Sequence, residues 1–250
     1  MRFLEKIKKG ESVLGPFSKT SDPSMIEAMG YAGFDFIIID MEHGPNTVLN
    51  AQNLIRAAEV SGTFPVIRVA DNNATDIGKA LDIGAKGVQV PQITTAEEAR
   101  AAVSHAKFSP LGMRGVCRFV RAAEFSNKDR FDYFQEANRQ FLILQLEGQE
   151  AIANFEDIIS VEGIDVIFLG PYDLSQALGV SGQINHPLVL EKMRYVIEKC
   201  KSKNIKSGVF TDRVQDAKRW LDLGVDYISF SVDVGIIQEA SKTIIHQLSI

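Results

Sequence analysis

The sequence alternates short apolar runs with longer helical segments along its whole length. The runs are rich in Ile, Val and Phe, and most lack polar alternation, which is typical of strands buried on both faces of a parallel sheet. Eight such runs span residues 12–17, 34–40, 65–69, 87–90, 140–146, 165–169, 206–210 and 227–230. Helical segments separate them, and one more follows the last. This order predicts a (β/α)8 TIM barrel, with a doubly wound open sheet as the alternative.

The helical segments carry recognisable start signals. Asp22 precedes Pro23, and Thr95 precedes an acidic first turn, as expected of helix N-termini. The predicted helices span residues 22–32, 47–61, 74–83, 95–107, 187–203, 214–223 and 235–247, with a further one ending near residue 160. No glycine-rich phosphate fingerprint follows the first strand, which argues against a dinucleotide-binding open sheet.

Length and charge narrow the class of protein. A chain of 250 residues suits one barrel, and no linker or low-complexity segment divides it, so residues 1–250 are predicted to form a single domain. A net charge of -5 argues against a nucleic-acid or anionic-membrane partner. Cys117 and Cys200 suggest neither a disulfide framework nor a metal pair. The first ten residues lack the apolar core of a signal peptide, so we expect a cytoplasmic protein.

One stretch, residues 109–139, does not fit the alternation. It contains prolines and glycines together with scattered arginines and aromatic residues. A connection of this length without clear periodicity is usually a functional loop or lid. The sequence therefore predicts a long loop here.

Ionisable residues stand where the predicted strands end. They are Asp40 and His43 after the second strand, Arg68 at the third, Glu147 after the fifth and Asp173 after the sixth. The carboxyl ends of barrel strands share one rim, so we expect these side chains to converge. Two carboxylates would hold a hard divalent ion, an arginine would bind an anionic oxygen, and a His–Asp pair would move protons. The alternative is that Glu147 and Asp173 merely cap the helices that follow them.

Several motifs occur together and in order. They are Asp40-Met41-Glu42-His43-Gly44-Pro45-Asn46, Val66-Ile67-Arg68-Val69, Leu81-Asp82-Ile83-Gly84-Ala85, Pro110-Leu111-Gly112-Met113-Arg114-Gly115, Gln145-Leu146-Glu147 and Gly170-Pro171-Tyr172-Asp173-Leu174-Ser175. In this the chain resembles the HpcH/HpaI family of metal-dependent class II pyruvate aldolases, which are (β/α)8 barrels.

The resemblance implies a role for each motif. Glu147 and Asp173 would bind Mg, Mn or Co, and Arg68 would stabilise the oxyanion of a pyruvate enolate. His43, oriented by Asp40, would move the proton of the aldehyde-derived hydroxyl. The implied substrate-binding residues are Gln145, Gly170, Pro171, Tyr172 and Asp173.

The implied reaction is cleavage of a 4-hydroxy-2-oxo acid, with a 2-keto-3-deoxy sugar acid as one candidate, to pyruvate and an aldehyde. Asp82 would be lent to a neighbouring subunit, because relatives are hexamers built as trimers of dimers. Phe210 and Phe230 depart from the smaller residues common in relatives, at the end of the site that faces the aldehyde. The alternatives are an acyl-CoA thioester lyase of the malyl-CoA or citramalyl-CoA type and a non-catalytic barrel that binds a 2-oxo acid.

Overall fold

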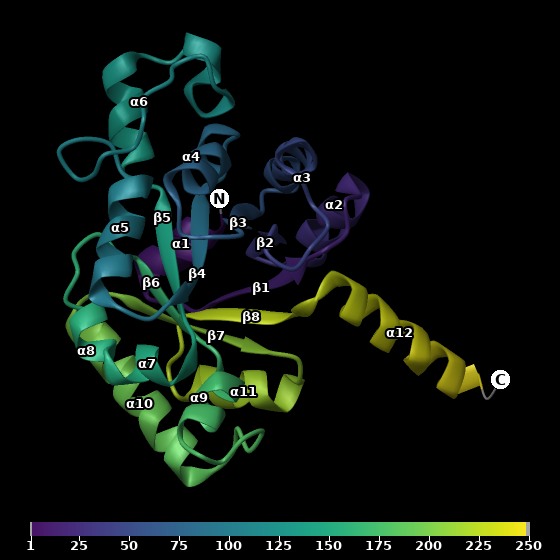
Figure 1. The fold of residues 1–250 in the computed structure, drawn as a ribbon. Helices are drawn as coiled ribbons and strands as arrows, with labels where there is room; N and C mark the ends of the chain where they lie inside the picture. The colour runs from purple at the N-terminus through teal and green to yellow at the C-terminus, as the bar shows by residue number, and fades with distance from the viewer. Residues whose placement is uncertain (1, 249–250) are drawn as a thin grey trace.

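A computed structural model describes residues 2–248, and it shows a closed barrel of eight parallel strands in sequential order (Figure 1). The strands are β1 (Val13–Ser18), β2 (Phe36–Asp40), β3 (Phe64–Arg68), β4 (Gly87–Ile93), β5 (Phe141–Leu146), β6 (Val166–Leu169), β7 (Lys206–Thr211) and β8 (Tyr227–Val232). β8 pairs with β1 and closes the sheet. The predicted TIM barrel is confirmed, and the open sheet is excluded.

Helices precede β1, lie between successive strands and follow β8. They are α1 (Arg2–Lys9), α2 (Pro23–Ala32), α3 (Val48–Val60), α4 (Ala74–Asp82), α5 (Ala96–Ala106), the 3-10 helix η1 (Arg121–Ser126), α6 (Arg130–Ala137), α7 (Gly148–Ala153), α8 (Phe155–Ile158), α9 (Pro171–Ala177), α10 (Pro187–Ser202), α11 (Val214–Asp222) and α12 (Asp233–Leu248). The expected caps are present: the Asp22 side chain accepts from the Ser24 N–H, and Thr95 forms a reciprocal capping box with Glu98.

Two connections differ in detail from the prediction. The segment 109–139 contains η1 and α6, and it joins the end of α5 to the start of β5. It therefore lies at the amino-terminal end of the barrel strands and cannot be a lid over the opposite rim of its own chain. The helix expected to end near residue 160 is two short helices, α7 and α8, which meet at Asn154.

Aromatic side chains fill the amino-terminal half of the barrel interior. Phe36 stacks on Tyr227 with ring centroids 4.0 Å apart, and Phe3 of α1 stacks on Phe64 at 4.1 Å. All four side chains are buried. Helix α1 thus closes this mouth, and the barrel interior opens at its carboxyl-terminal mouth.

Helix α12 projects away from the barrel toward the C-terminus (Figure 1). Only its first residue, Asp233, is buried, and Ile237, Ile244 and Ile245 are exposed. The sequence left open whether this helix packs on its own barrel or on a partner. In the described chain it does not pack on its own barrel beyond its first turn. Within residues 2–248, no helix combines the length and apolarity required of a membrane span.

Candidate active site

A cavity of about 250 Å3 opens at the carboxyl ends of the strands. Its polar lining comes from five strand ends: Lys19 after β1, Asp40 of β2, Arg68 of β3, Gln145 of β5 and Asp173 after β6. The apolar wall is formed by Phe17, Phe168, Phe210 and Val232. The size suits a small metabolite rather than a polymer.

Asp40 and Arg68 form a buried ion pair at the rim. Asp40 lies opposite Arg68 in the β2–β3 register, so the guanidinium meets the carboxylate directly. Arg68 Nε donates to Oδ1 at 3.0 Å and Nη2 donates to Oδ2 at 2.7 Å. Burial raises the pKa of Asp40, but the Arg68 hydrogen bonds and charge, with the N–H groups of His43 and Glu42, outweigh burial and hold this pKa below its usual range.

His43 is not oriented by Asp40 as predicted. Asp40 accepts the backbone N–H of His43 at 3.2 Å, while both of its carboxylate oxygens are taken by Arg68. The His43 imidazole is 64% exposed, and its Nε2 lies 3.8 Å from Glu42 Oε1. The acid beside the imidazole is therefore Glu42 and not Asp40, because the β2–β3 register places Asp40 opposite Arg68.

Glu42 also contacts Arg68. Arg68 Nη1 lies 3.0 Å from Glu42 Oε2, and the Glu42 side chain is only 6% exposed. The Gln92 amide donates to the other oxygen of this carboxylate at 3.0 Å. One guanidinium is thus shared by Asp40 and Glu42, which fixes its position at the rim.

Glu147 lies close to two other acids. Burial raises the pKa of the Glu147 carboxyl, and the nearby Glu42 and Asp173 carboxylates raise it further, against the opposing hydrogen bond from Gln145. Partial desolvation also raises the pKa of Asp173, although this residue is exposed. Acids crowded in this way favour proton uptake or a bound cation. The oxygens of Glu147 and Asp173 are the donors that a hard divalent ion prefers.

The segment after β6 forms the floor beside these acids. Gly170, Pro171, Tyr172 and Asp173 all line the cavity. The Asp173 carboxylate folds over Gly170, where any larger residue would clash with Asp173 Oδ2. The glycine is therefore required for this placement of the Asp173 carboxylate.

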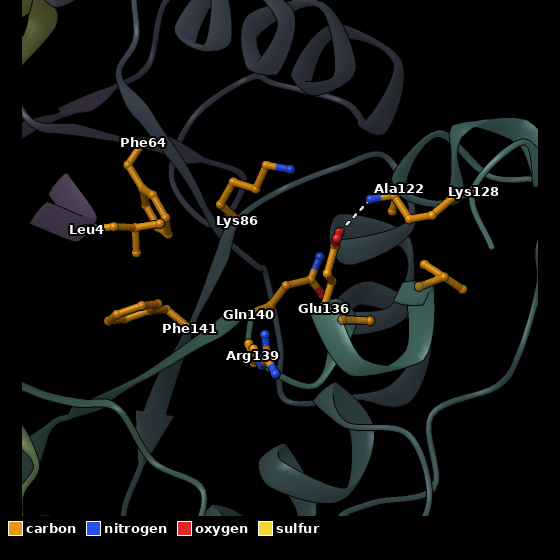
Figure 2. A pocket seen from close by; sticks show the side chains of 11 residues that line it. Leu4, Phe64, Lys86, Ala122, Lys128, Glu136, Arg139, Gln140 and Phe141 are labelled. Atoms are coloured by element: carbon orange, nitrogen blue, oxygen red, sulfur yellow. Dashed lines mark hydrogen bonds and ion pairs between the residues drawn. The ribbon is translucent and has the colours of Figure 1, made fainter. Parts of the chain in front are cut away.

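A second cavity, of about 190 Å3, lies at the other end of the barrel near α1 and α6 (Figure 2). Leu4, Phe64 and Phe141 form its apolar side, and the Lys128 ammonium is paired with Glu136 at 2.5 Å. Glu136 is the one acid among its lining residues, within the part of the chain that the structure describes. This second cavity lacks the converging acids found at the carboxyl-terminal rim, so the rim cavity is the candidate active site.

The comparisons with known proteins agree with this geometry. The model of the HpcH/HpaI aldolase/citrate lyase family matches residues 14–240. The chain belongs to this family. It is 34% identical over 242 residues to the 5-keto-4-deoxy-D-glucarate aldolase of Shigella boydii, covering 96% of this chain and 93% of that protein. The fold matches an HpcH/HpaI aldolase/citrate lyase family protein from Burkholderia cenocepacia with a TM-score of 0.90 and 32% identity, over 100% of both chains.

A further solved structure gives the same result. The HpcH/HpaI aldolase from Desulfitobacterium hafniense matches with a TM-score of 0.91 and 29% identity, over 99% of this chain and 96% of that one. The resemblance read from the motifs is therefore confirmed. As an HpcH/HpaI protein with aldolase relatives, the chain is a carbon–carbon lyase.

Asp82 of this HpcH/HpaI chain does not reach its own rim. It is the last residue of α4, which runs back toward the start of β4. Its carboxylate accepts a hydrogen bond from Arg114 Nη2 at 2.7 Å and is 28% exposed. This position excludes Asp82 from the active site of its own subunit and is compatible with a role in the active site of another subunit.

Three residues near the site were given no role from the sequence. Lys19 lies one residue beyond β1, and the predicted strand stopped two residues short of it. Glu42 was noted as ionisable but not assigned. Gln89 is fully buried and donates to Gln145 Oε1 at 2.5 Å, which orients the Gln145 amide. The rule that strand ends carry chemistry would have found Lys19 had the end of β1 been placed correctly.

Proposed function

We propose that the chain is a divalent-metal-dependent class II aldolase that cleaves a 4-hydroxy-2-oxo acid to pyruvate and an aldehyde. The observation that carries the proposal is the convergence of a doubly held Arg68 with the acids Glu42, Glu147 and Asp173 at one rim. This set provides a fixed positive charge for an oxyanion and carboxylates for a cation, which are the two requirements for forming an enolate.

Glu147 and Asp173 fit a divalent ion by their chemistry. Both carboxyls have raised pKa values because they are partly desolvated, with Glu147 half-buried and Asp173 more exposed, and each is an oxygen donor on a neighbouring strand end. The described residues contain no group of three or more His, Cys, Asp or Glu placed to hold a metal, so substrate and water would complete the coordination. A bound Mg, Mn or Co ion would supply a Lewis acid next to the 2-oxo group.

Arg68 would stabilise the charge that develops during cleavage. When the bond between C3 and C4 breaks, its electron pair stays on C3 and is delocalised onto the 2-oxo oxygen as a pyruvate enolate. Asp40 and Glu42 hold the guanidinium in place beforehand, so no reorganisation is needed as the charge forms. A proton from solvent then adds to C3 and completes the methyl group of pyruvate, while the proton taken from the 4-hydroxyl group returns to solvent.

His43 would accept the proton of the 4-hydroxyl group. Its imidazole is exposed at the rim and has Glu42 as its neighbouring acid. Loss of this proton leaves the former C4 as the aldehyde carbon. Gln145, held by Gln89, and the segment from Gly170 to Asp173 would position the 2-oxo acid on the opposite side of the cavity.

The relatives suggest the substrate class. A 5-keto-4-deoxy-glucarate is a six-carbon diacid that carries a 2-oxo-3-deoxy acid at one end, so its cleavage gives pyruvate and a three-carbon aldehyde acid. We propose a diacid of this kind for this chain. We also propose a homo-oligomeric enzyme, a hexamer by its resemblance, in which Asp82 serves the site of a neighbouring subunit.

Release of pyruvate tests the function directly. Purified protein is stripped of metal with a chelator, incubated with 4-hydroxy-2-oxo acids, and assayed for pyruvate through lactate dehydrogenase and NADH oxidation. We expect turnover only after Mg, Mn or Co is restored. The variant Glu147→Ala should lose activity, whereas the exposed Glu150→Ala, three residues away, should retain it.

Two outcomes contradict the proposal. Pyruvate release that is indifferent to chelation would exclude a metal-dependent mechanism. Folded protein that is inactive on these acids but cleaves a malyl-CoA-type thioester would establish the thioester-lyase alternative instead.

A further inference from the structure

The rim cavity has a second cationic group besides Arg68. Lys19 follows β1, whereas Gly170 and Asp173 follow β6, and β7 and β8 separate these strands in the closed barrel. Lys19 and the segment that follows β6 therefore lie at well-separated parts of the carboxyl-terminal mouth. Phe17, Phe210 and Val232 form the apolar wall of the same cavity. A ligand that spans it would have its 2-oxo acid end near β5 and β6 and its other end near Lys19.

The backbone at Lys19 is held firmly. Asp233, at the junction of β8 and α12, is 1% exposed and accepts hydrogen bonds from several groups at the end of β1. The N–H of Lys19 donates to Asp233 Oδ2 at 3.0 Å, and the N–H of Thr20 donates at 2.9 Å. The Ser18 hydroxyl donates to the same carboxylate at 2.7 Å. The Lys19 side chain therefore extends from a backbone position at the rim that these hydrogen bonds fix.

Lys19 makes only a long ion pair with its nearest acid. Its Nζ lies 3.8 Å from Asp40 Oδ2, beyond hydrogen-bond distance, and Arg68 already donates to both oxygens of Asp40. Within residues 2–248, no hydrogen bond from the Lys19 ammonium is found. An ammonium carries three donors. With the side chain 34% exposed beside the cavity, these donors are available to a ligand.

We propose that Lys19 binds the carboxylate at the far end of the aldehyde fragment, so that this enzyme prefers acidic aldehydes to neutral ones. This inference rests on the proposed aldolase function and adds a specificity-determining residue to it. In the cleavage direction, the same contact would recognise the second carboxylate of a diacid substrate. Lys19 and Arg68 are the two cations that line the cavity among the described residues, and Arg68 is already held by Asp40 and Glu42.

The test uses two aldehydes that differ at one carbon. Tartronate semialdehyde carries a carboxylate where glyceraldehyde carries a hydroxymethyl group, and each is condensed with pyruvate by the metal-loaded enzyme. The quantity measured is the ratio of kcat/KM for the two aldehydes. We expect Lys19→Met to lower this ratio by about 10- to 100-fold, since a hydrogen bond to a charged group is lost. Lys19→Arg should restore most of it because the charge is kept.

Lys218→Met is the matched control, because Lys218 is an exposed lysine on α11 outside the cavity. Its ratio should equal that of the unaltered enzyme. A ratio in Lys19→Met within about twofold of the unaltered value would overturn the inference while leaving the aldolase function intact. If the unaltered enzyme condenses neither aldehyde with pyruvate, the proposed function fails, and the inference fails with it.

Discussion

Replacing Asp40 by Asn should destabilise the protein through the buried ion pair at the rim. Asp40 is fully buried and accepts two hydrogen bonds from Arg68 and two more from the backbone N–H groups of Glu42 and His43. An asparagine keeps one acceptor oxygen and turns an NH2 group toward a guanidinium that also donates. The arginine is then left buried with Glu42 as the acid that still contacts it directly, among the described residues.

The expected cost follows from that geometry. Removing one partner of a buried ion pair costs about 3–5 kcal/mol, and Glu42 would offset part of this, so we expect a loss of about 2–4 kcal/mol in the free energy of unfolding. Urea denaturation at fixed protein concentration should show a midpoint lowered by about 1 M or more. The exposed Asp212→Asn, which makes the same chemical change on the surface, should change the midpoint little.

A double-mutant cycle with Arg68→Met isolates the pair. We expect a coupling free energy of about 1.5–3 kcal/mol between Asp40 and Arg68. The difference in the free energy of unfolding between the unaltered protein and Asp40→Asn should also depend on pH. Because the folded state lowers the pKa of Asp40, its stabilisation is present above the ordinary value of about 3.9 and is lost as the pH falls through the lowered value. A coupling below about 0.5 kcal/mol, or a difference that grows on acidification, would refute the reasoning.

Two further predictions concern the barrel and the subunits. Gly15→Ala should cost about 3 kcal/mol of unfolding free energy, because its Cβ would clash with the carbonyl oxygen of Phe36. Gly78→Ala, in open space within α4, should stabilise the protein by about 0.5–1 kcal/mol, and thermal unfolding separates the two variants. If subunits share sites, the inactive variants Asp82→Ala and Glu147→Ala should regain activity when they are mixed, partially unfolded and refolded together. Absence of restored activity would place Asp82 outside the site.

The barrel was predictable because its signals are local. Most strands are largely buried apolar runs, and in β2 every residue is buried. Several helices, such as α2 and α5, begin at a recognisable cap. The segment 109–139 was not predictable. η1 contains Glu124 and Phe125 in left-handed conformations, and α6 has only 8 residues, so neither gives a periodic pattern.

The site was predictable in its location more than in its contacts. That Asp40, Arg68 and Asp173 share one rim follows from their positions at strand ends. That Asp40 binds Arg68 and not the His43 imidazole depends on the register between β2 and β3, which the sequence does not specify. Lys19 was missed for a similar reason, because the end of β1 at Ser18 is set by its pairing with β2.

Enolisation of pyruvate tests the central claim most directly, because it requires no aldehyde. Loss of the methyl protons of pyruvate in D2O is followed by NMR with metal-stripped protein and after addition of Mg, Mn or Co. The account predicts exchange that depends on the metal, that Glu147→Ala and Arg68→Ala abolish, and that Glu150→Ala retains. Absence of exchange with any of these metals, from protein shown to be folded by circular dichroism, would contradict the proposed aldolase mechanism.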